Sequence, residues 1–407
     1  MKVIRSLSFA ADERSTLREI NSMAWPQLLK FTDRAQLTLP LGTRCLEFLP
    51  PDIRARIESN LANNRLRYER ISNEYQLISG TLHNRSIDFV FLKGITQWPF
   101  YSDDRCARPQ YDIDIYCPPG VIESAREALI EVGYKAIEGR PNPTDHFAPM
   151  IRCPWTWRGD YYAVDLPITI ELHFQFWDEA TECIPCPEVN GFWNGRLNRD
   201  IGGMRLPTLD PVDGIIYTSL HLVRHLLRGD LRPYHVYEMA HFLERTATND
   251  MVWRRWRDVH DYGNPVLEGI AFRLAAEWFG PKMHPLPLSA IDQLSVPVDR
   301  WFKLFSLSPL RAIEYPNKDE LLLHLSLVQN PKRRVFIAYR RLLPLQIPKV
   351  TAIPAPDGRV RGTRLGHTLK RTKLALQRAR YHLRAMRSLM QSAFRLRSFK
   401  RSLQSAS

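Results

Sequence analysis

The chain has 407 residues, of which 44% are hydrophobic and 11% aromatic, so it can bury a substantial core in two or three domains. It holds no apolar run near the length of a membrane span, its N-terminal segment meets charge too early for a secretory signal, and its six cysteines are scattered, so we expect a cytoplasmic protein. The net charge of +14 comes from residues 358–407, which hold 14 Lys and Arg and no Asp or Glu. The rest of the chain is neutral, with 43 basic and 43 acidic residues.

Residues 1–84 are predicted to form an N-terminal helical region. Ile71, Tyr75, Ile78 and Leu82 recur at helical spacing, and Pro50-Pro51 separates two helical segments. We expect these helices to pack against the region that follows and to carry no chemistry of their own.

Residues 85–208 alternate between strand-like and helix-like segments. The pattern predicts, in chain order, a strand at 87–92, a short helix opened by Gly94, a strand at 111–116, an amphipathic helix at 121–132 stopped by Gly133, and a strand at 168–176. Such an alternation is typical of an α/β (α+β) domain.

The strand at 111–116 carries two acids, Asp112 and Asp114, that are two residues apart. Side chains alternate along a strand, so both carboxylates leave one face while Ile113 and Ile115 leave the other. Two adjacent carboxylates repel each other unless a divalent cation lies between them, and oxygen ligands suit Mg²⁺ or Mn²⁺ with substrate phosphates. The pair alone would also fit the polar face of an exposed strand.

A third acid favours the metal-site interpretation. Glu171 lies within a β-branched and aromatic segment, on the same predicted strand face as His173 and Gln175. A glutamate at such a position could complete a two-metal site.

The order and spacing of these residues resemble the uncharacterised nucleotidyltransferase-like proteins of the DNA polymerase beta-type nucleotidyltransferase superfamily. The resemblance covers about residues 20–250 and runs through Leu92-Lys93-Gly94, Tyr101, Arg108-Pro109, Asp112-Ile113-Asp114, Gly133-Tyr134, His146 and Glu171-Leu172-His173. It implies a polymerase beta-like core with a mixed sheet over residues 85–208, and nucleotide phosphates beside Lys93-Gly94.

Residues 209–330 are predicted to form a C-terminal helical region. Asp210 is a typical N-cap with Pro211 at the first helical position, and His221 and His225 lie four residues apart on one face of the helix that follows. The two histidines could bind a metal, line a substrate pocket or be buried, and the sequence leaves these alternatives open.

Residues 331–407 are predicted to be a basic linker and an amphipathic helical tail. Residues 343–356 read as a linker, and Leu369, Leu376, Leu383 and Met390 then recur every seven residues on a cationic helix. Such a tail could bind an anionic membrane surface, making the protein peripheral to a membrane, or bind nucleic acid; docking on the protein body is the alternative.

These observations together predict a metal-dependent nucleotidyltransferase that moves a nucleoside monophosphate from an NTP to an acceptor hydroxyl. Asp112, Asp114 and Glu171 are the expected catalytic and Mg²⁺ or Mn²⁺ ligands, Lys93, Gly94 and Arg108 the expected nucleotide-binding residues, and His146, His173, His221 and His225 the expected acceptor or accessory residues. The alternatives are a sugar-nucleotide-dependent glycosyltransferase and a non-catalytic adaptor that binds membrane or nucleic acid through its tail.

Overall fold

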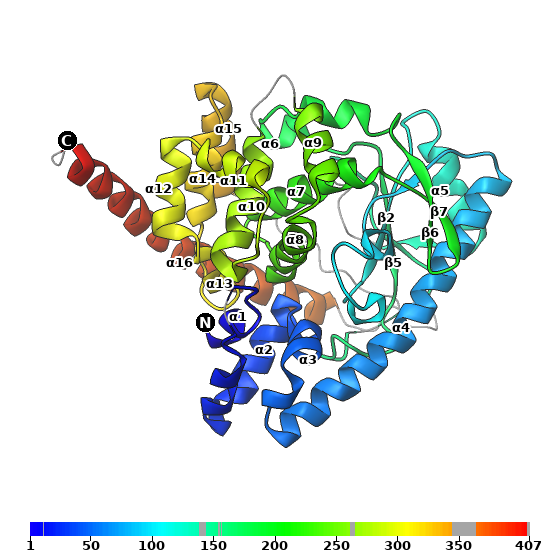
Figure 1. The fold of residues 1–407 in the computed structure, drawn as a ribbon, viewed down its shortest axis with the longest axis horizontal. Coiled ribbons are helices and arrows are strands. Elements are labelled where there is room, and N and C mark those ends of the chain that lie inside the picture. Colours follow the sequence, from blue (N-terminus) through cyan, green and yellow to red (C-terminus); the bar gives the residue numbers. More distant parts are fainter. Residues whose placement is uncertain are drawn as a thin grey trace.

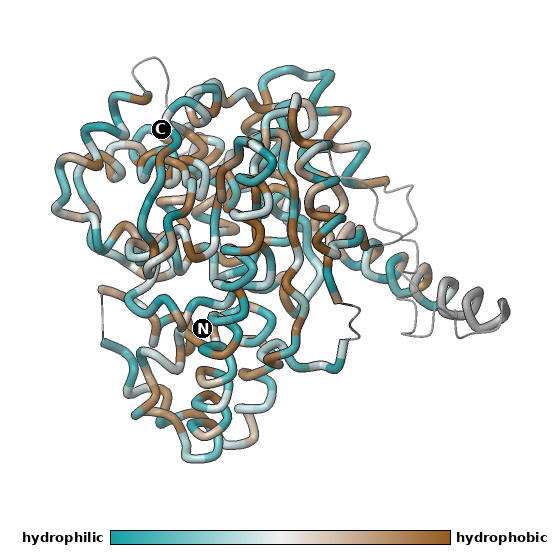
Figure 2. The backbone as a smooth tube through the Cα atoms, turned by 90° about the vertical axis from the view of Figure 1, so that its right-hand side faces the viewer, coloured by the Kyte–Doolittle hydropathy of each residue, from teal (hydrophilic) through white to brown (hydrophobic). Residues whose placement is uncertain are grey.

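The protein consists of a mixed sheet on one side and a helical body on the other (Figure 1). The computed structural model describes residues 1–10, 12–137, 144–153, 155, 157–260, 265–343 and 364–404, without the side chains of 364–371, 374, 397 and 399–404. Figure 2 shows hydrophobic residues concentrated in the inner segments of this arrangement. The predicted α/β class with flanking helices is confirmed.

The N-terminal region is helical, as predicted. Its helices are α1 (Lys2–Ser6), α2 (Trp25–Ala35), α3 (Thr38–Cys45) and α4 (Pro51–Asn84). The long helix α4 starts at the second of the two prolines and runs along the outer side of the sheet (Figure 1). Its four residues with helical spacing, Ile71, Tyr75, Ile78 and Leu82, are all buried against the sheet.

The sheet has seven strands in the order β3-β4-β5-β2-β1-β7-β6. The strands are β1 (Val90–Phe91), β2 (Asp112–Tyr116), β3 (Lys135–Ala136), β4 (Met150–Ile151), β5 (Thr169–His173), β6 (Leu197–Ile201) and β7 (Met204–Thr208), with α5 (Ile122–Glu131) and the short α6 (Glu179–Glu182) between them. Strand β2 lies at the centre, antiparallel to β1 and parallel to β5. The strands predicted at 87–92 and 168–176 exist but are shorter.

The two faces of β2 have different surroundings. Ile113 and Ile115 are fully buried in the core formed with α4 and α5, as the alternation predicted. Asp114 leaves the opposite face and is also buried, with 2% of its surface exposed. A buried carboxylate needs compensating partners, and these come from the helical body.

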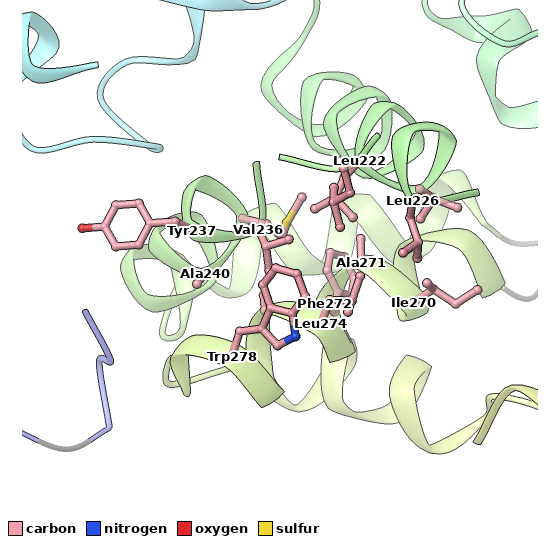
Figure 3. Packing of buried hydrophobic residues seen from close by; sticks show 14 of the residues in the cluster. Leu222, Leu226, Val236, Tyr237, Ala240, Ile270, Ala271, Phe272, Leu274 and Trp278 are labelled. Atoms are coloured by element: carbon pink, nitrogen blue, oxygen red, sulfur yellow. The ribbon is translucent and has the colours of Figure 1, made fainter. Parts of the chain in front are cut away.

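The helical body begins with α7 (Pro211–Arg228), which Asp210 caps by accepting a hydrogen bond from the Val212 amide, as predicted. The following helices are α8 (Pro233–Thr246), α9 (Asp250–Val259), α10 (Val266–Phe279), α11 (Pro285–Asp292), α12 (Val296–Phe305), α13 (Ser308–Ala312), α14 (Asp319–Leu327) and α15 (Pro331–Leu342). Figure 3 shows α7, α8 and α10 meeting through buried side chains such as Leu222, Val236 and Phe272. This core anchors the polar side of α7 against the sheet.

The last described element is α16 (Arg364–Gln404), a single helix that confirms the predicted tail helix. It packs against α12 and α14 and extends past them at its C-terminal end (Figure 1). The predicted linker at 343–356 lies outside the described residues from 344 onward. Among the described residues, no helix combines the length and the apolar character needed to cross a bilayer.

Candidate active site

A pocket of about 320 Å³ lies between the sheet and the helices α7 and α8. Its lining includes Lys93, Arg108, Asp112, His146 and Glu171 from the sheet region, Thr218, His221, Arg224, His225 and Arg228 from α7, and Arg232, Tyr234, His235 and Glu238 from the start of α8. Acidic, basic and imidazole side chains that are far apart in the sequence therefore meet in one polar cavity.

Asp114 lies beneath this pocket and is held by two nitrogen atoms. Lys93 Nζ is 3.1 Å from one carboxylate oxygen, and His173 Nε2 is 3.0 Å from the other. Burial by itself would raise the pKa of Asp114, but Lys93 and His173 outweigh it and hold the pKa below its usual value. The carboxylate is therefore charged and fully paired.

Glu171 lies beside Asp114 because β2 and β5 run in parallel register. Asp114 pairs with Glu171 across the two strands, and Asp112 pairs with Thr169. Burial, followed by the repulsion of Asp114 and Asp112, raises the pKa of Glu171 to about 7. The register sets Asp114 and Glu171 side by side, and the role of these two acids with Asp112 in one site stays a prediction.

Two groups of side chains have the composition of a metal site. Ligand atoms of Asp114, Glu171 and His173 lie within 4.8 Å of one another, and those of Asp145, His146 and His173 do so as well. Two carboxylates and an imidazole are a donor set that suits a divalent cation. Asp112, a predicted ligand, lines the pocket next to the first group without being part of it.

Gly94, which was predicted to lie beside nucleotide phosphates, has a packing role in the structure. The helix that it opens is a single 3-10 turn, Gly94–Gln97, and the Gly94 amide donates a hydrogen bond to Gln97 Oε1. Its φ of +81° is in the region that favours glycine, and a Cβ atom here would lie 2.4 Å from both Tyr75 Oη and Gln110 Nε2. Close packing in the protein requires this glycine, and the short turn supplies little helix dipole for phosphates.

Arg108 reaches the pocket wall but is bound to other residues. Its Nε donates to Glu238 Oε1 at 2.7 Å, and its Nη2 donates to Gln97 Oε1 at 2.8 Å. Burial raises the pKa of Glu238, and Arg108 opposes that rise. These contacts favour a structural role for Arg108, which links α8 to the segment just before β2.

His146 is positioned by a buried acid that the sequence did not reveal. Its Nδ1 lies 2.8 Å from Asp145 Oδ1, and its Nε2 points toward Glu171, 3.6 Å from Oε2. Asp145 is fully buried and also pairs with Arg224 of α7. The pair with Asp145 orients the imidazole so that its second nitrogen faces the carboxylates.

Three histidines form a cluster on the α7 and α8 wall. His221 Nε2 accepts a hydrogen bond from Lys93 Nζ at 2.8 Å, because an ammonium can only donate, and lies 3.1 Å from His225 Nε2. His235 packs edge-on against His221. Burial, with the nearby Lys93 charge, places the pKa of His221 well below its usual value, so this imidazole is neutral. His221 and His225 both line the pocket and His221 is also buried, whereas metal binding by this pair stays a prediction.

A comparison with protein families places this arrangement in context. A family model described as uncharacterised nucleotidyltransferase matches residues 21–280. The chain belongs to this nucleotidyltransferase family. The match confirms the resemblance inferred from the sequence and contains the whole pocket, whereas α15 and α16 lie outside it. No curated protein and no solved structure matches the chain.

Several residues of this nucleotidyltransferase-family pocket had no signal in the sequence. Asp145, Arg224, Arg228, Arg232 and Glu238 are ordinary charged residues of loops and helices, and only the docking of α7 and α8 on the sheet brings them to the site. Three arginines that line the pocket already have acidic partners: Arg108 with Glu238, Arg224 with Asp145, and Arg228 with Glu182 at 2.6 Å. Arg232 is exposed and has no ion pair within the described part of the chain.

Proposed function

We propose that the protein is a metal-dependent nucleotidyltransferase that transfers a nucleoside monophosphate from an NTP to an acceptor hydroxyl. The observation that carries this proposal is the cluster of Asp114, Glu171 and His173 beneath a pocket lined with cationic side chains, in a chain of the nucleotidyltransferase family. The family supports the reaction class, and the pocket supports a triphosphate as the ligand.

The acidic cluster is the proposed cation site. Asp114, Glu171 and His173, with Asp112 at the pocket wall, are the residues that would hold Mg²⁺ or Mn²⁺. When bound, such a cation neutralises phosphate charge and lowers the pKa of an acceptor oxygen. The raised pKa of Glu171 fits this assignment, because it reflects a carboxylate that is buried and that lies beside the charges of Asp114 and Asp112.

The cationic wall of the pocket is the proposed triphosphate site. Lys93 and Arg232 are its best contacts, since Lys93 lies between Asp114 and His221 and Arg232 has no acidic partner. Arg224 and Arg228 add to the positive potential while they hold the helices in place. Triphosphate binding would draw the Lys93 ammonium from Asp114 toward the phosphates, which frees a carboxylate oxygen.

His146 is the proposed acceptor-side residue. Its Nε2 faces the pocket next to Glu171, and Asp145 fixes its ring. It can orient an acceptor hydroxyl by hydrogen bonding at the edge of the acidic cluster. His173, with 1% of its side chain exposed, has no access to an acceptor and belongs with Asp114 to the proposed cation site.

The test is transfer of a labelled nucleotide. Purified full-length protein is incubated with each α-³²P-labelled NTP, Mg²⁺ or Mn²⁺, and fractionated pools of sugars, small metabolites, proteins and RNA. We expect labelled product with one NTP and one pool, and none with Asp112→Asn. Lack of transfer with all pools, together with lack of metal-dependent NTP binding in equilibrium dialysis, would contradict the proposal.

The same experiment separates the alternative functions. A sugar-nucleotide-dependent glycosyltransferase would bind and turn over UDP-sugars rather than NTPs, and family membership favours the NTP. A non-catalytic adaptor would bind neither class in a metal-dependent way. Dialysis against labelled NTPs and UDP-sugars, with and without Mn²⁺, therefore distinguishes the three.

A further inference from the structure

The described side chains of helix α16 form two apolar faces, of which one packs on the protein and the other is exposed. Ala385, Leu389 and Ser392 are buried where the helix contacts α12 and α14. Leu376, Leu383, Met390 and Phe394 are 57%, 72%, 64% and 72% exposed. With about 100° of rotation per residue, these four side chains lie on the side opposite the packed residues. We call them the outer face of α16.

The outer face is bordered by unpaired positive charge. Lys373, Arg380, Arg384 and Arg387 lie along one side of it and are exposed, and none forms an ion pair among the described residues. The chain offers no acid beyond Asp357 to balance them. Hydrophobic and hydrophilic residues alternate along the coloured turns of this helix in Figure 2.

We propose that the outer face of α16 binds the surface of an anionic lipid bilayer, with the helix lying in the plane of the interface. Exposed aliphatic side chains cost free energy in water and gain it in the acyl region, and arginines beside them reach the lipid phosphates. The packed face holds the helix on the body, so the whole protein is held at the membrane surface.

The chemistry of the outer face favours this occupant over two others. Single-stranded RNA would require exposed aromatic rings for base stacking, but three of the four outer-face residues are aliphatic. In a symmetric pair of α16 helices from two copies of the chain, the rows of unpaired cations would lie side by side. The repulsion between these rows opposes such a pair. A lipid surface satisfies both the aliphatic row and the cations.

The position of α16 makes the proposal independent of catalysis. The outer face lies outside the family match, and none of its residues lines the pocket. Binding to lipid is therefore expected to leave NTP binding unchanged, and a failure of either proposal does not affect the other.

The experiment is flotation of the full-length protein with phosphatidylcholine vesicles, with and without phosphatidylserine. We expect binding to the anionic vesicles alone, weakened by salt because exposed charges are screened. Arg380→Gln, Arg384→Gln and Arg387→Gln together should lower the partition coefficient about 100-fold. Leu376→Ser, Leu383→Ser and Met390→Ser together should also abolish flotation, because the apolar contacts are lost.

Matched controls use exposed residues elsewhere. Met23→Ser with Met251→Ser removes apolar side chains that are 86% and 81% exposed, and Lys30→Gln with Lys135→Gln and Arg205→Gln removes three exposed charges. Circular dichroism and the melting temperature check that every variant is folded.

Three results of the binding experiments would overturn the proposal. They are no flotation with anionic vesicles at low salt, equal losses in the control and outer-face variants, and binding to single-stranded RNA or self-association in sedimentation equilibrium that depends on the outer face while flotation does not. Because the outer-face side chains are exposed, a variant that unfolds would mean that the face is structural, which also overturns it.

Discussion

Lys93 Nζ lies 3.1 Å from Asp114 Oδ2, so an ammonium group contacts the carboxylate that belongs to the candidate cation site. The same nitrogen donates to His221 Nε2 at 2.8 Å. Lys93 is thus shared between the acidic cluster and the imidazole wall of the pocket. Because a cation and an ammonium compete for one carboxylate, this contact leads to a direct test of the site.

Replacing Lys93 with methionine should strengthen divalent-cation binding in the absence of nucleotide. The substitution keeps an unbranched side chain and removes the competing charge, and we expect about a 10-fold lower Kd for Mn²⁺, roughly 1.4 kcal/mol. Electron paramagnetic resonance of free Mn²⁺ measures this directly. Lys30→Met, at an exposed position outside the pocket, is the control. Unchanged or weaker Mn²⁺ binding would place the cation away from Asp114.

Replacing each of the two β2 aspartates with asparagine should lower the free energy of unfolding by different amounts, although both variants should lose transfer activity. Asp114→Asn leaves Lys93 and His173 without their buried anion and should cost on the order of 3 kcal/mol. The Asp112 side chain forms no ion pair among the described residues, so Asp112→Asn should change stability by only about 0.5 kcal/mol. Urea unfolding of the two variants measures the difference. Equal stabilities would contradict the structural role of the Asp114 pairs.

Glu171→Gln should slow the chemical step more than it weakens nucleotide binding. Glu171 lies on the His146 side of the cluster, where the acceptor is proposed to bind, and Lys93 and Arg232 face the triphosphate. Single-turnover rates and equilibrium dialysis with NTP give the two quantities separately. Equal losses in rate and affinity would make Glu171 a primary nucleotide ligand.

Arg232→Gln should weaken NTP binding about 10-fold without changing the melting temperature. The side chain lines the pocket and has no ion pair in the described chain, so its removal breaks no salt bridge, and a charge-assisted bond to phosphate contributes about 1.5 kcal/mol. Arg205→Gln, an exposed arginine outside the pocket lining, serves as the comparison. A normal Kd for NTP in Arg232→Gln would remove this residue from the triphosphate site.

The free energy of unfolding should fall between about pH 6.5 and pH 9 because of a buried ion cluster around His260. Its ring nitrogens lie 3.5 Å from Glu188 and 3.1 Å from Glu268. Burial opposes the charge, but the two carboxylates outweigh it and raise the pKa of His260 to about 9. A group whose pKa is higher in the folded state stabilises the fold fully at pH values below its unfolded-state pKa. This stabilisation is lost as the pH rises through the folded-state pKa.

The expected loss is on the order of 1–2 kcal/mol, after allowance for solvent screening. Urea unfolding at a series of pH values measures it. Glu268→Gln removes one of the two partners and should flatten the decline across this range. A decline of the same size in Glu268→Gln would assign the pH dependence to other groups.

Local patterns in the sequence determined the elements of this protein. The alternation around Asp112 and Asp114, the Asp210-Pro211 start of α7 and the seven-residue repeat of α16 each involve neighbours within one or two turns, and all three appear in the structure. Such patterns predict an element correctly because the period of a strand or helix is a property of the backbone alone.

Tertiary structure alone decided which side chains meet. The parallel register that sets Asp114 beside Glu171, the reach of Lys93 to His221 of α7, and the pairing of Asp145 with Arg224 join residues far apart in the chain. It also decided that Gly94 is needed for packing and that Leu376, Leu383 and Met390 of the α16 repeat are exposed. These contacts depend on how whole elements pack, and periodicity carries no information about the partner of a face.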